Sequence, residues 1–207
     1  TTFRHYQGSS AAAESSVTIN IPARVKSIKS VFFTHSNSAD KSNNQKFGVT
    51  TSLANNMSEY QFRIGSVVYP PTSVKLSATA HDGVYTNKGE AYSELRKAFG
   101  TLGDYSEGGV LLSQDTYLEG QPSRDNAVYP SNSTPQQPTM NPFGLDFEAF
   151  PKTALESGVN SADRSLPMSL EFKKHSGNGP AAVTTDVWVM CDAIFYVNLD
   201  GSISVSI

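Results

Sequence analysis

The sequence predicts an all-β protein, an antiparallel jelly-roll sandwich of about eight strands with one short helix and long polar loops. Apolar and polar residues alternate in many short runs, as they do where one face of a strand is buried. Helical spacing is confined to one stretch. Strands and helices do not alternate regularly along the chain, so antiparallel pairing is expected rather than a parallel sheet.

The length of 207 residues suits one compact domain, which we expect to span residues 17–207. Residues 1–16 are rich in Ser, Ala and Thr and lack a sustained period, so they are predicted to be an arm or linker. The chain begins with Thr1 rather than Met, which suggests a processed product or a piece of a longer polypeptide.

The chain before the helix is predicted to be β-rich. Its five expected β-segments are residues 17–21, 25–34, 60–64, 67–69 and 74–80. A polar stretch at residues 35–47 is expected to be a loop. Gly65 stands first in a two-residue turn, which suits a type II′ hairpin, and Pro70-Pro71 is expected to close the returning strand.

The single helix is predicted at residues 89–99. Apolar residues recur there at helical spacing, and Gly100 is placed as a C-terminal cap; the apolar residues are Ala91, Tyr92, Leu95, Ala98 and Phe99. Residues 120–143 combine several prolines with many Ser, Asn and Gln, a composition that cannot form a packed core. We therefore expect a long exposed loop there.

The last part of the chain is again predicted to be β-structure, at residues 145–150, 166–172, 186–199 and 202–207. The run 186–199 is apolar on both faces: Val187, Val189 and Cys191 alternate with Trp188, Met190, Ile194 and Tyr196. Such a strand is buried between two layers or against a neighbouring subunit. Asp200-Gly201 suits a tight turn, so the chain is expected to end inside its sheet.

Composition argues against several classes of partner. The net charge of −3 provides no positive field for phosphate backbones, so direct nucleic-acid binding is not expected. Apolar runs stay short of the roughly 20 residues that a membrane-spanning helix needs. Cys191 is the one cysteine, which excludes an internal disulfide and a zinc site built from several cysteines.

The search for catalytic or metal-binding patterns predicts no active site and no cofactor. The histidines His5, His35, His81 and His175 lack metal-ligand spacing and are expected to be solvated loop residues. Neither a nucleophile elbow nor a phosphate-binding glycine loop occurs. Asn56 and Asn132 satisfy the short glycosylation pattern, which matters only in a secretory compartment.

Three carboxylates admit alternative interpretations. Asp146 and Glu148 lie two apart on a predicted strand, as paired carboxylates do in some jelly-roll glycoside hydrolases, or they form the polar face of an amphipathic strand. Asp192 interrupts an apolar run, and a structural ion pair is a simpler interpretation than a catalytic acid.

A carbohydrate- or receptor-binding module is a further alternative for the function of the chain. In that case Trp188, Tyr117 or Tyr129 would stack on sugar rings.

Several segments, taken in order, resemble the second half of double jelly-roll, hexon-like major capsid proteins of the double-stranded DNA virus lineage that includes virophages and polinton-like viruses. The segments are IPARVKSIKSVF (residues 21–32), YQFRIGS (60–66), YPP (69–71), EAYSEL (90–95), DFEAF (146–150), SGVN (157–160) and the terminal strand pair. Their order and spacing carry the likeness, which covers most of the chain beyond residue 16.

The resemblance implies a structural capsid protein without enzymatic activity, found in the virion and assembled inside the infected host cell. Such proteins form trimeric, pseudo-hexagonal capsomers that tile an icosahedral shell. This sequence has strands for only one jelly roll, so a companion domain or chain is expected to supply the other. The candidate interface residues are Phe3, Tyr6, Tyr129, Trp188, Met190, Ile194 and Tyr196.

Overall fold

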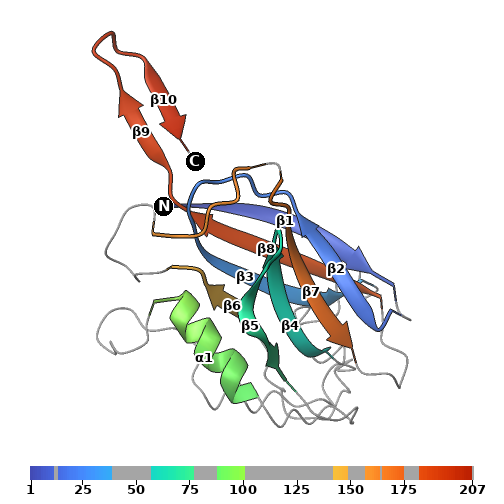
Figure 1. The fold of residues 1–207 in the computed structure, drawn as a ribbon. Helices are drawn as coiled ribbons and strands as arrows, with labels where there is room; N and C mark the ends of the chain where they lie inside the picture. Colours follow the sequence, from blue (N-terminus) through green and yellow to red (C-terminus); the bar gives the residue numbers. More distant parts are fainter. Residues whose placement is uncertain are drawn as a thin grey trace, which may run out of the picture.

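The computed structural model of the chain describes residues 1–11, 14–38, 57–76, 88–100, 142–148, 157–163, 165–174 and 182–206 (Figure 1). Two four-stranded antiparallel sheets face each other, and a third sheet of two strands stands apart from them. One helix is present in the described part of the chain, α1 at Lys88–Ala98. The predicted all-β class is confirmed, and the predicted helix at 89–99 is displaced by one residue.

Sheet A contains the strands β1 (Thr2–Ser10), β8 (Val183–Cys191), β3 (Ile28–Asn37) and β6 (Phe143–Asp146), in this spatial order. Sheet B contains β2 (Ser16–Ile21), β7 (Met168–Lys174), β4 (Met57–Ile64) and β5 (Val67–Lys75).

The strand pairing follows one scheme. The first strand pairs with the eighth, the second with the seventh, the third with the sixth and the fourth with the fifth, each time antiparallel. Wrapping this long four-strand hairpin into two layers brings β8 beside β3 and β7 beside β4. That is the jelly-roll arrangement, in which two Greek keys share one sandwich.

Aromatic side chains fill the space between the two sheets. Phe33 of sheet A lies with its ring centroid 5.0 Å from those of Tyr60 and Phe143 and 5.9 Å from that of Phe62. All four are fully or almost fully buried. Offset and edge-to-face contacts of this kind add to the area that each ring buries. The core is thus centred on β3, β4 and β6.

The first strand corrects the expectation of an arm at residues 1–16. Thr2–Ser10 pairs along its whole length with β8 at the edge of sheet A. Its inward positions, Thr2, Arg4, Tyr6, Gly8 and Ser10, are mostly polar or small, so no apolar alternation reveals the strand. Gly8 is required to be small, because a Cβ there would lie 2.5 Å from Ile19 Cγ2 of β2.

Several strand limits also differ from the expectations. β3 continues to Asn37, so the polar loop predicted to begin at residue 35 begins later. β5 continues through Pro70 and Pro71 to Lys75 rather than stopping at them. It is the edge strand of sheet B, where a residue without an N–H is tolerated. The turn before it has the expected positive φ, 59° at Gly65.

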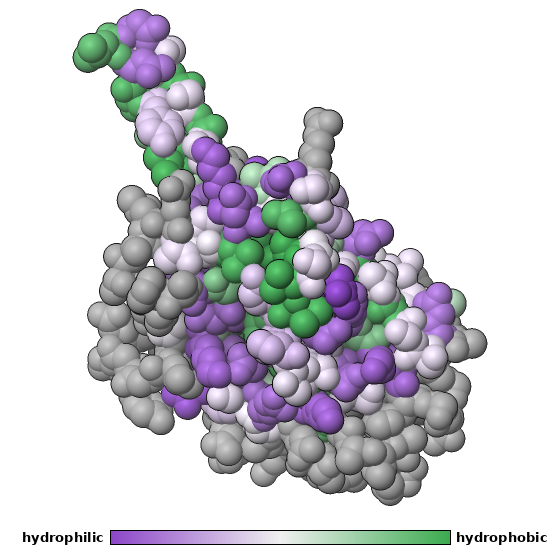
Figure 2. Space-filling model, in the orientation of Figure 1, coloured by the Kyte–Doolittle hydropathy of each residue, from purple (hydrophilic) through white to green (hydrophobic). Residues whose placement is uncertain are grey.

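The terminal strands form a separate hairpin. The run predicted as one strand at residues 186–199 is divided after Cys191, and β9 (Ile194–Val197) pairs with β10 (Ile203–Ser206). This terminal hairpin points away from the sandwich (Figures 1 and 2). The expectation that the chain ends inside its sheet is therefore wrong. The predicted turn is confirmed, with Gly201 at φ 81°.

Some expectations fall on residues outside the described ranges: the loop at 120–143 apart from its end, most of 35–47, and the single residues Asn56, His81, Tyr117, Tyr129, Asn132 and His175. Among the described helices, none has the length and apolar character needed to cross a membrane.

Candidate functional site

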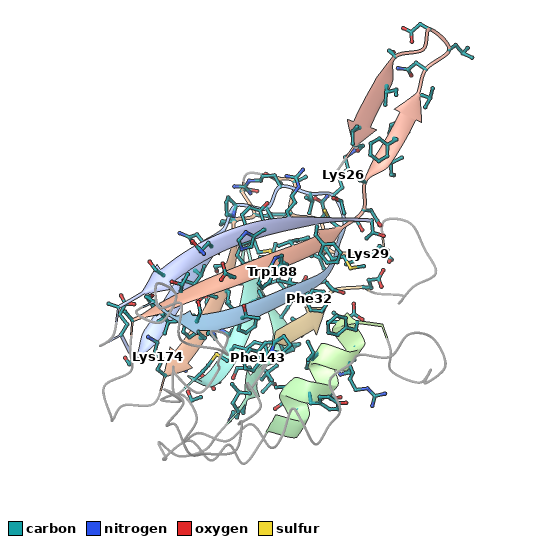
Figure 3. The ribbon with its side chains drawn as sticks, turned by 180° about the vertical axis from the view of Figure 1, so that it is seen from behind. Lys26, Lys29, Phe32, Phe143, Lys174 and Trp188 are labelled. Carbon is teal, nitrogen blue, oxygen red and sulfur yellow. The ribbon has the colours of Figure 1, made fainter. Side chains whose placement is uncertain are left out.

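An apolar groove of about 350 Å³ lies on the outer face of sheet A, beside the end of α1. Its lining comes from β1, β3, β8 and the end of the helix, and consists of Phe3, Phe32, Ala98, Phe99, Trp188 and Met190. Figure 3 views the molecule from this side, with Trp188 and Phe32 on neighbouring strands. Because none of the lining residues is charged, the groove is suited to contact the apolar surface of another molecule.

Register explains how these residues come together. Phe3 lies opposite Met190, His5 opposite Trp188, and Trp188 opposite Phe32, all on the side of sheet A that faces away from the core. Trp188 stacks on His5 with ring centroids 5.2 Å apart, and Phe32 contacts Phe99 at 4.6 Å. Phe3 and Phe99 are 59% and 45% exposed, so the rim of the groove is open to solvent.

The terminal hairpin presents a second apolar surface. Its large exposed apolar residues are Phe195, Tyr196, Val197, Leu199, Ile203 and Val205. Neither β9 nor β10 contains a charged residue. Lys26 Nζ donates a hydrogen bond of 2.8 Å to Ser206 Oγ at the base of the hairpin. An isolated two-stranded hairpin is marginally stable in water. These exposed side chains are therefore suited to a contact with another surface.

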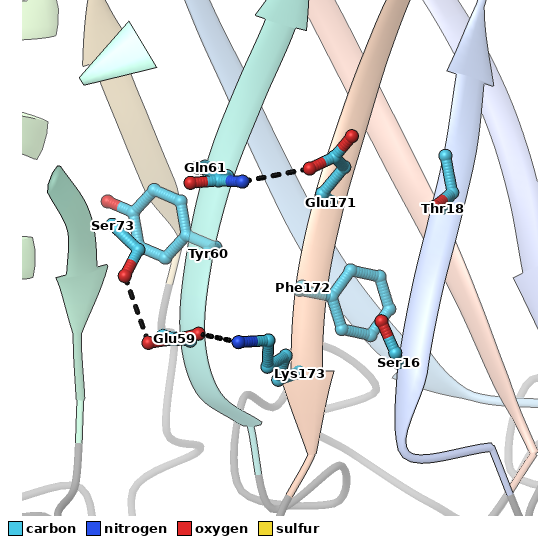
Figure 4. Close-up of a pocket in the computed structure, with 9 residues that line it drawn as sticks. All are labelled: Ser16, Thr18, Glu59, Tyr60, Gln61, Ser73, Glu171, Phe172 and Lys173. Carbon is cyan, nitrogen blue, oxygen red and sulfur yellow. Dashed lines mark hydrogen bonds and ion pairs between the residues drawn. The ribbon is translucent and has the colours of Figure 1, made fainter. Parts of the chain in front are cut away.

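The outer face of sheet B is polar, and it contains a shallow hollow of about 240 Å³ (Figure 4). Glu59 pairs with Lys173 at 2.6 Å and accepts a hydrogen bond of 2.9 Å from Ser73. Glu171 accepts hydrogen bonds from Gln61 at 2.8 Å and from Arg63 at 2.5 and 3.2 Å. The two carboxylates are thus held by cross-strand partners, as on the solvated face of a sandwich.

Hydrogen bonds lower the pKa of both carboxyls. The bond from Lys173 is the main cause for Glu59, and the bond from Arg63 is the main cause for Glu171. Both groups are therefore ionised and fully paired near neutral pH, which suits a structural role better than proton transfer.

A second polar cluster is buried at the end of sheet A near the terminal hairpin. Lys29 Nζ lies 2.5 Å from Glu148 Oε1 and 3.4 Å from Asp192 Oδ2. The three side chains are only 10–11% exposed. Burial works to lower the pKa of Lys29, but Glu148 and Asp192 outweigh it and raise that pKa above its ordinary value. We refer to Lys29, Glu148 and Asp192 as the buried triad.

Serine side chains complete the surroundings of the buried triad. Ser27 Oγ donates to Asp192 Oδ2 at 3.1 Å, and Ser157 Oγ donates to Glu148 Oε1 at 2.9 Å. The Asp192 N–H donates to the Ser27 carbonyl at 3.1 Å. Asp192 thus has a charged partner, Lys29, as the ion-pair interpretation predicted. Lys29 was not singled out in the sequence, although a lysine between Ile28 and Val31 in a β-rich run is a signal for a buried partner.

Asp146 and Glu148, the carboxylates considered for glycoside hydrolysis, are both engaged in contacts with neighbouring groups. Asp146 ends β6 and its Oδ1 accepts the Glu148 N–H at 3.0 Å, while Glu148 belongs to the buried triad. Burial is the main cause that raises the pKa of Asp146. Neither residue lines the apolar groove or the hollow on sheet B. The pair thus lacks a described cavity for a sugar.

His35 was expected to be a solvated loop residue, and that expectation is wrong. It lies in β3 with its side chain fully buried, between Thr185 Oγ1 at 3.0 Å from Nδ1 and Met57 Sδ at 3.3 Å from Nε2. His5, by contrast, is half exposed and lies 3.1 Å from Asp186. Among the described residues, no group of three or more His, Cys, Asp or Glu side chains could hold a metal ion.

The structure divides the predicted interface residues between two places. Phe3, Trp188 and Met190 line the apolar groove, whereas Ile194 and Tyr196 belong to the terminal hairpin. Tyr6 faces inward and packs against the core. Phe32 and Phe99 join the groove without having been predicted, because their role depends on the helix lying beside sheet A. No protein-family model and no curated protein sequence matches the chain.

Proposed function

We propose that the chain is a structural jelly-roll subunit of a virus capsid, and that its work is self-association rather than catalysis. The observation that carries the proposal is the terminal hairpin, which exposes six large apolar side chains while standing apart from the sandwich. Monomeric soluble proteins rarely leave such a surface uncovered. The jelly-roll topology and the resemblance to double jelly-roll capsid proteins support the same conclusion.

The terminal hairpin and the apolar groove are suited to each other. Both surfaces consist of apolar side chains and lack charged residues in β9, β10 and the groove lining. The hairpin points away from its own sandwich in Figures 1 and 3, so it can reach a second copy. We therefore propose that the hairpin of one copy occupies the groove of the next.

A contact between two different surfaces of identical chains closes into a ring when the rotation between copies permits it. Three copies joined in this way form a trimer, the unit expected of a pseudo-hexagonal capsomer. A companion jelly-roll domain or chain completes that capsomer in the proposed icosahedral shell. The net charge of −3 fits a shell segment that makes no direct contact with nucleic acid.

Sedimentation velocity across a concentration series tests the proposal. We expect wild-type chain to form trimers, and the variant Phe195→Ser/Val197→Ser to remain monomeric because both substitutions remove apolar contacts from the hairpin. Val67→Ser is the matched control, since Val67 is an exposed apolar residue at the other sheet and its loss should leave the trimer intact. A wild-type chain that stays monomeric at high concentration and joins no companion jelly roll would overturn the proposal.

The alternative of a carbohydrate- or receptor-binding module depends on Trp188, which is partly exposed at the groove. Sugar sites combine an aromatic face with polar groups that fix the hydroxyls. The groove lining supplies aromatic faces without such polar side chains, which favours a protein surface as its occupant. Binding on a glycan array that is lost in Trp188→Ala would favour the alternative instead.

A further inference from the structure

The buried triad joins three neighbouring strands of sheet A. Lys29 lies in β3, an inner strand of the sheet, while Asp192 directly follows β8 on one side and Glu148 follows β6 on the other. The strand register shifts between Ile28 and Ser30, so Lys29 is the extra residue of a bulge. A bulge re-aims a side chain, and here the Lys29 amine lies between two carboxylates.

An ion pair of this composition is costly to bury. Two carboxylates share one ammonium in a site where each side chain is about nine-tenths removed from solvent. Removing an ion from water is unfavourable unless its partners compensate for the lost hydration. A reaction that removes one cation and one anion together would relieve that cost. Condensation of the amine with a carboxyl does this.

We propose that Lys29 and Asp192 condense to an intramolecular isopeptide bond, with Glu148 as the catalytic carboxylate. Lys29 Nζ already lies 3.4 Å from Asp192 Oδ2, in contact with the carboxyl group whose carbon it would attack. Glu148 Oε1 lies 2.5 Å from the same nitrogen, where it can remove a proton from it. Because the fold holds the reacting groups side by side, the condensation is an intramolecular step and needs no encounter between separate molecules.

The reaction balances without any co-reactant. Lys29 begins as an ammonium, and Glu148 takes one proton from Nζ and passes it to an Asp192 carboxyl oxygen. The neutral amine then attacks Asp192 Cγ and forms the N–C bond. Glu148 transfers a second proton from Nζ to the same oxygen, the C–O bond breaks, and water leaves. Glu148 ends as the carboxylate it was at the start.

Ser27 and Ser157 serve as positioning residues. Ser27 Oγ donates to Asp192 Oδ2, so it can stabilise the negative charge that develops on this oxygen during the attack. Ser157 Oγ donates to Glu148 Oε1 and fixes the carboxylate beside Nζ, from which Ser157 Oγ lies 3.1 Å. After condensation, the Glu148 carboxylate retains Ser157 and the new amide N–H as donors, so it is not left unpaired.

The intact mass of the purified chain, measured after denaturation, decides the proposal. We expect a mass lower than that of the sequence by one water molecule, because the amide survives unfolding. Trypsin should then yield residues 27–41 joined to residues 175–207, since cleavage after Lys29 is blocked. A folded chain, verified by circular dichroism, that has the full mass of its sequence would overturn the proposal.

Variants assign the atoms involved. Lys29→Arg retains the charge but cannot form the amide, and Glu148→Gln removes the proton carrier, so both should have full mass. Asp192→Asn should lose ammonia instead of water, because the leaving group changes. Lys26→Arg is the matched control, since this neighbouring lysine bonds Ser206 and its replacement should preserve the water loss. Water loss that persists in Lys29→Arg or Asp192→Asn would place the bond elsewhere and overturn the proposal.

This bond is independent of the proposed capsid function, because it forms within one chain and is detected on the monomer. Its position has a structural consequence nevertheless. Asp192 lies between β8 and β9, so the bond ties the base of the terminal hairpin covalently to β3, an inner strand of sheet A.

Discussion

His35 lies in the middle of the core with its Nδ1 3.0 Å from Thr185 Oγ1 on the neighbouring strand β8. Its ring also makes an edge contact with Phe172 of sheet B, at 4.8 Å between centroids. Burial, with the charge of Lys174 as the second cause, lowers the pKa of His35 to about 3. The imidazole therefore stays neutral while the protein is folded at ordinary pH.

The free energy of unfolding should fall as the pH falls below about 6.5, the ordinary pKa of histidine. Below that pH the unfolded chain binds a proton at His35, whereas the folded chain binds one only near pH 3. Above pH 6.5 the neutral His35 does not reduce the free energy of unfolding. Between pH 6.5 and about 3, that free energy falls by about 1.4 kcal/mol per pH unit. Denaturant unfolding at several pH values measures it.

His35→Gln should flatten this pH dependence, at the cost of lower stability at neutral pH. Phe62→Leu is the matched control, because it also loosens the buried core but leaves His35 in place, so the slope should persist. Equal slopes in wild type and His35→Gln would contradict the argument.

The cross-strand pair of Arg63 and Glu171 on sheet B should contribute little to stability. Arg63 is 40% exposed, so solvent screens the attraction in spite of two hydrogen bonds. A double-mutant cycle with Arg63→Met and Glu171→Gln should give a small coupling free energy that decreases further as salt is added. The coupling should also vanish as acid protonates Glu171, whose pKa is lowered mainly by the Arg63 hydrogen bond. A coupling that persists in acid would show that packing, not charge, joins the pair.

Local patterns predicted most of the sandwich, because one face of each strand is apolar. The alternation of Val17, Ile19 and Ile21 predicts β2. The spacing of Ala91, Leu95 and Ala98 predicts the helix. β1 could not be predicted in this way, since its inward side chains are polar or small and its stability comes from pairing with β8. Pairing between strands that are far apart in the sequence leaves no local pattern of residues from which a strand can be predicted.

The candidate site was predicted less completely. Trp188, Met190 and Tyr196 were predicted as interface candidates, and the structure places them at the apolar groove and on the terminal hairpin. The division of their strand after Cys191 was not expected. The apolar groove needs Phe32 from β3 and Phe99 from the helix end. The buried triad needs Lys29 from β3 together with Asp192 and Glu148, which follow β8 and β6. Only the sheet order brings these residues together.

Gly144 fixes how closely the helix lies on sheet A, so Gly144→Ala should destabilise the protein. A Cβ at this position would lie 3.0 Å from Ala98 Cβ and 3.1 Å from both Leu95 Cδ1 and Phe32 Cδ1. Overpacking of this kind costs about 1–3 kcal/mol. Thermal or denaturant unfolding would measure the loss.

Gly89→Ala, in the helix that packs against Gly144, is the control in which added volume should not destabilise the protein. Its added Cβ meets nothing within 4 Å, and alanine is the better helix former, so a small gain of about 0.5 kcal/mol is expected. A Gly144→Ala variant as stable as wild type would indicate that the helix can move away from β6 without loss.

Trp188 allows assembly to be followed directly, because it is the one tryptophan of the chain and lies in the apolar groove. If the terminal hairpin of a second copy covers the groove, Trp188 loses contact with water when copies associate. Its fluorescence emission should then shift to shorter wavelength as protein concentration rises. Phe195→Ser/Val197→Ser should abolish the shift, whereas Val67→Ser should preserve it. Association without any shift would mean that the hairpin is seated on another surface, because a covered groove cannot leave the indole hydrated.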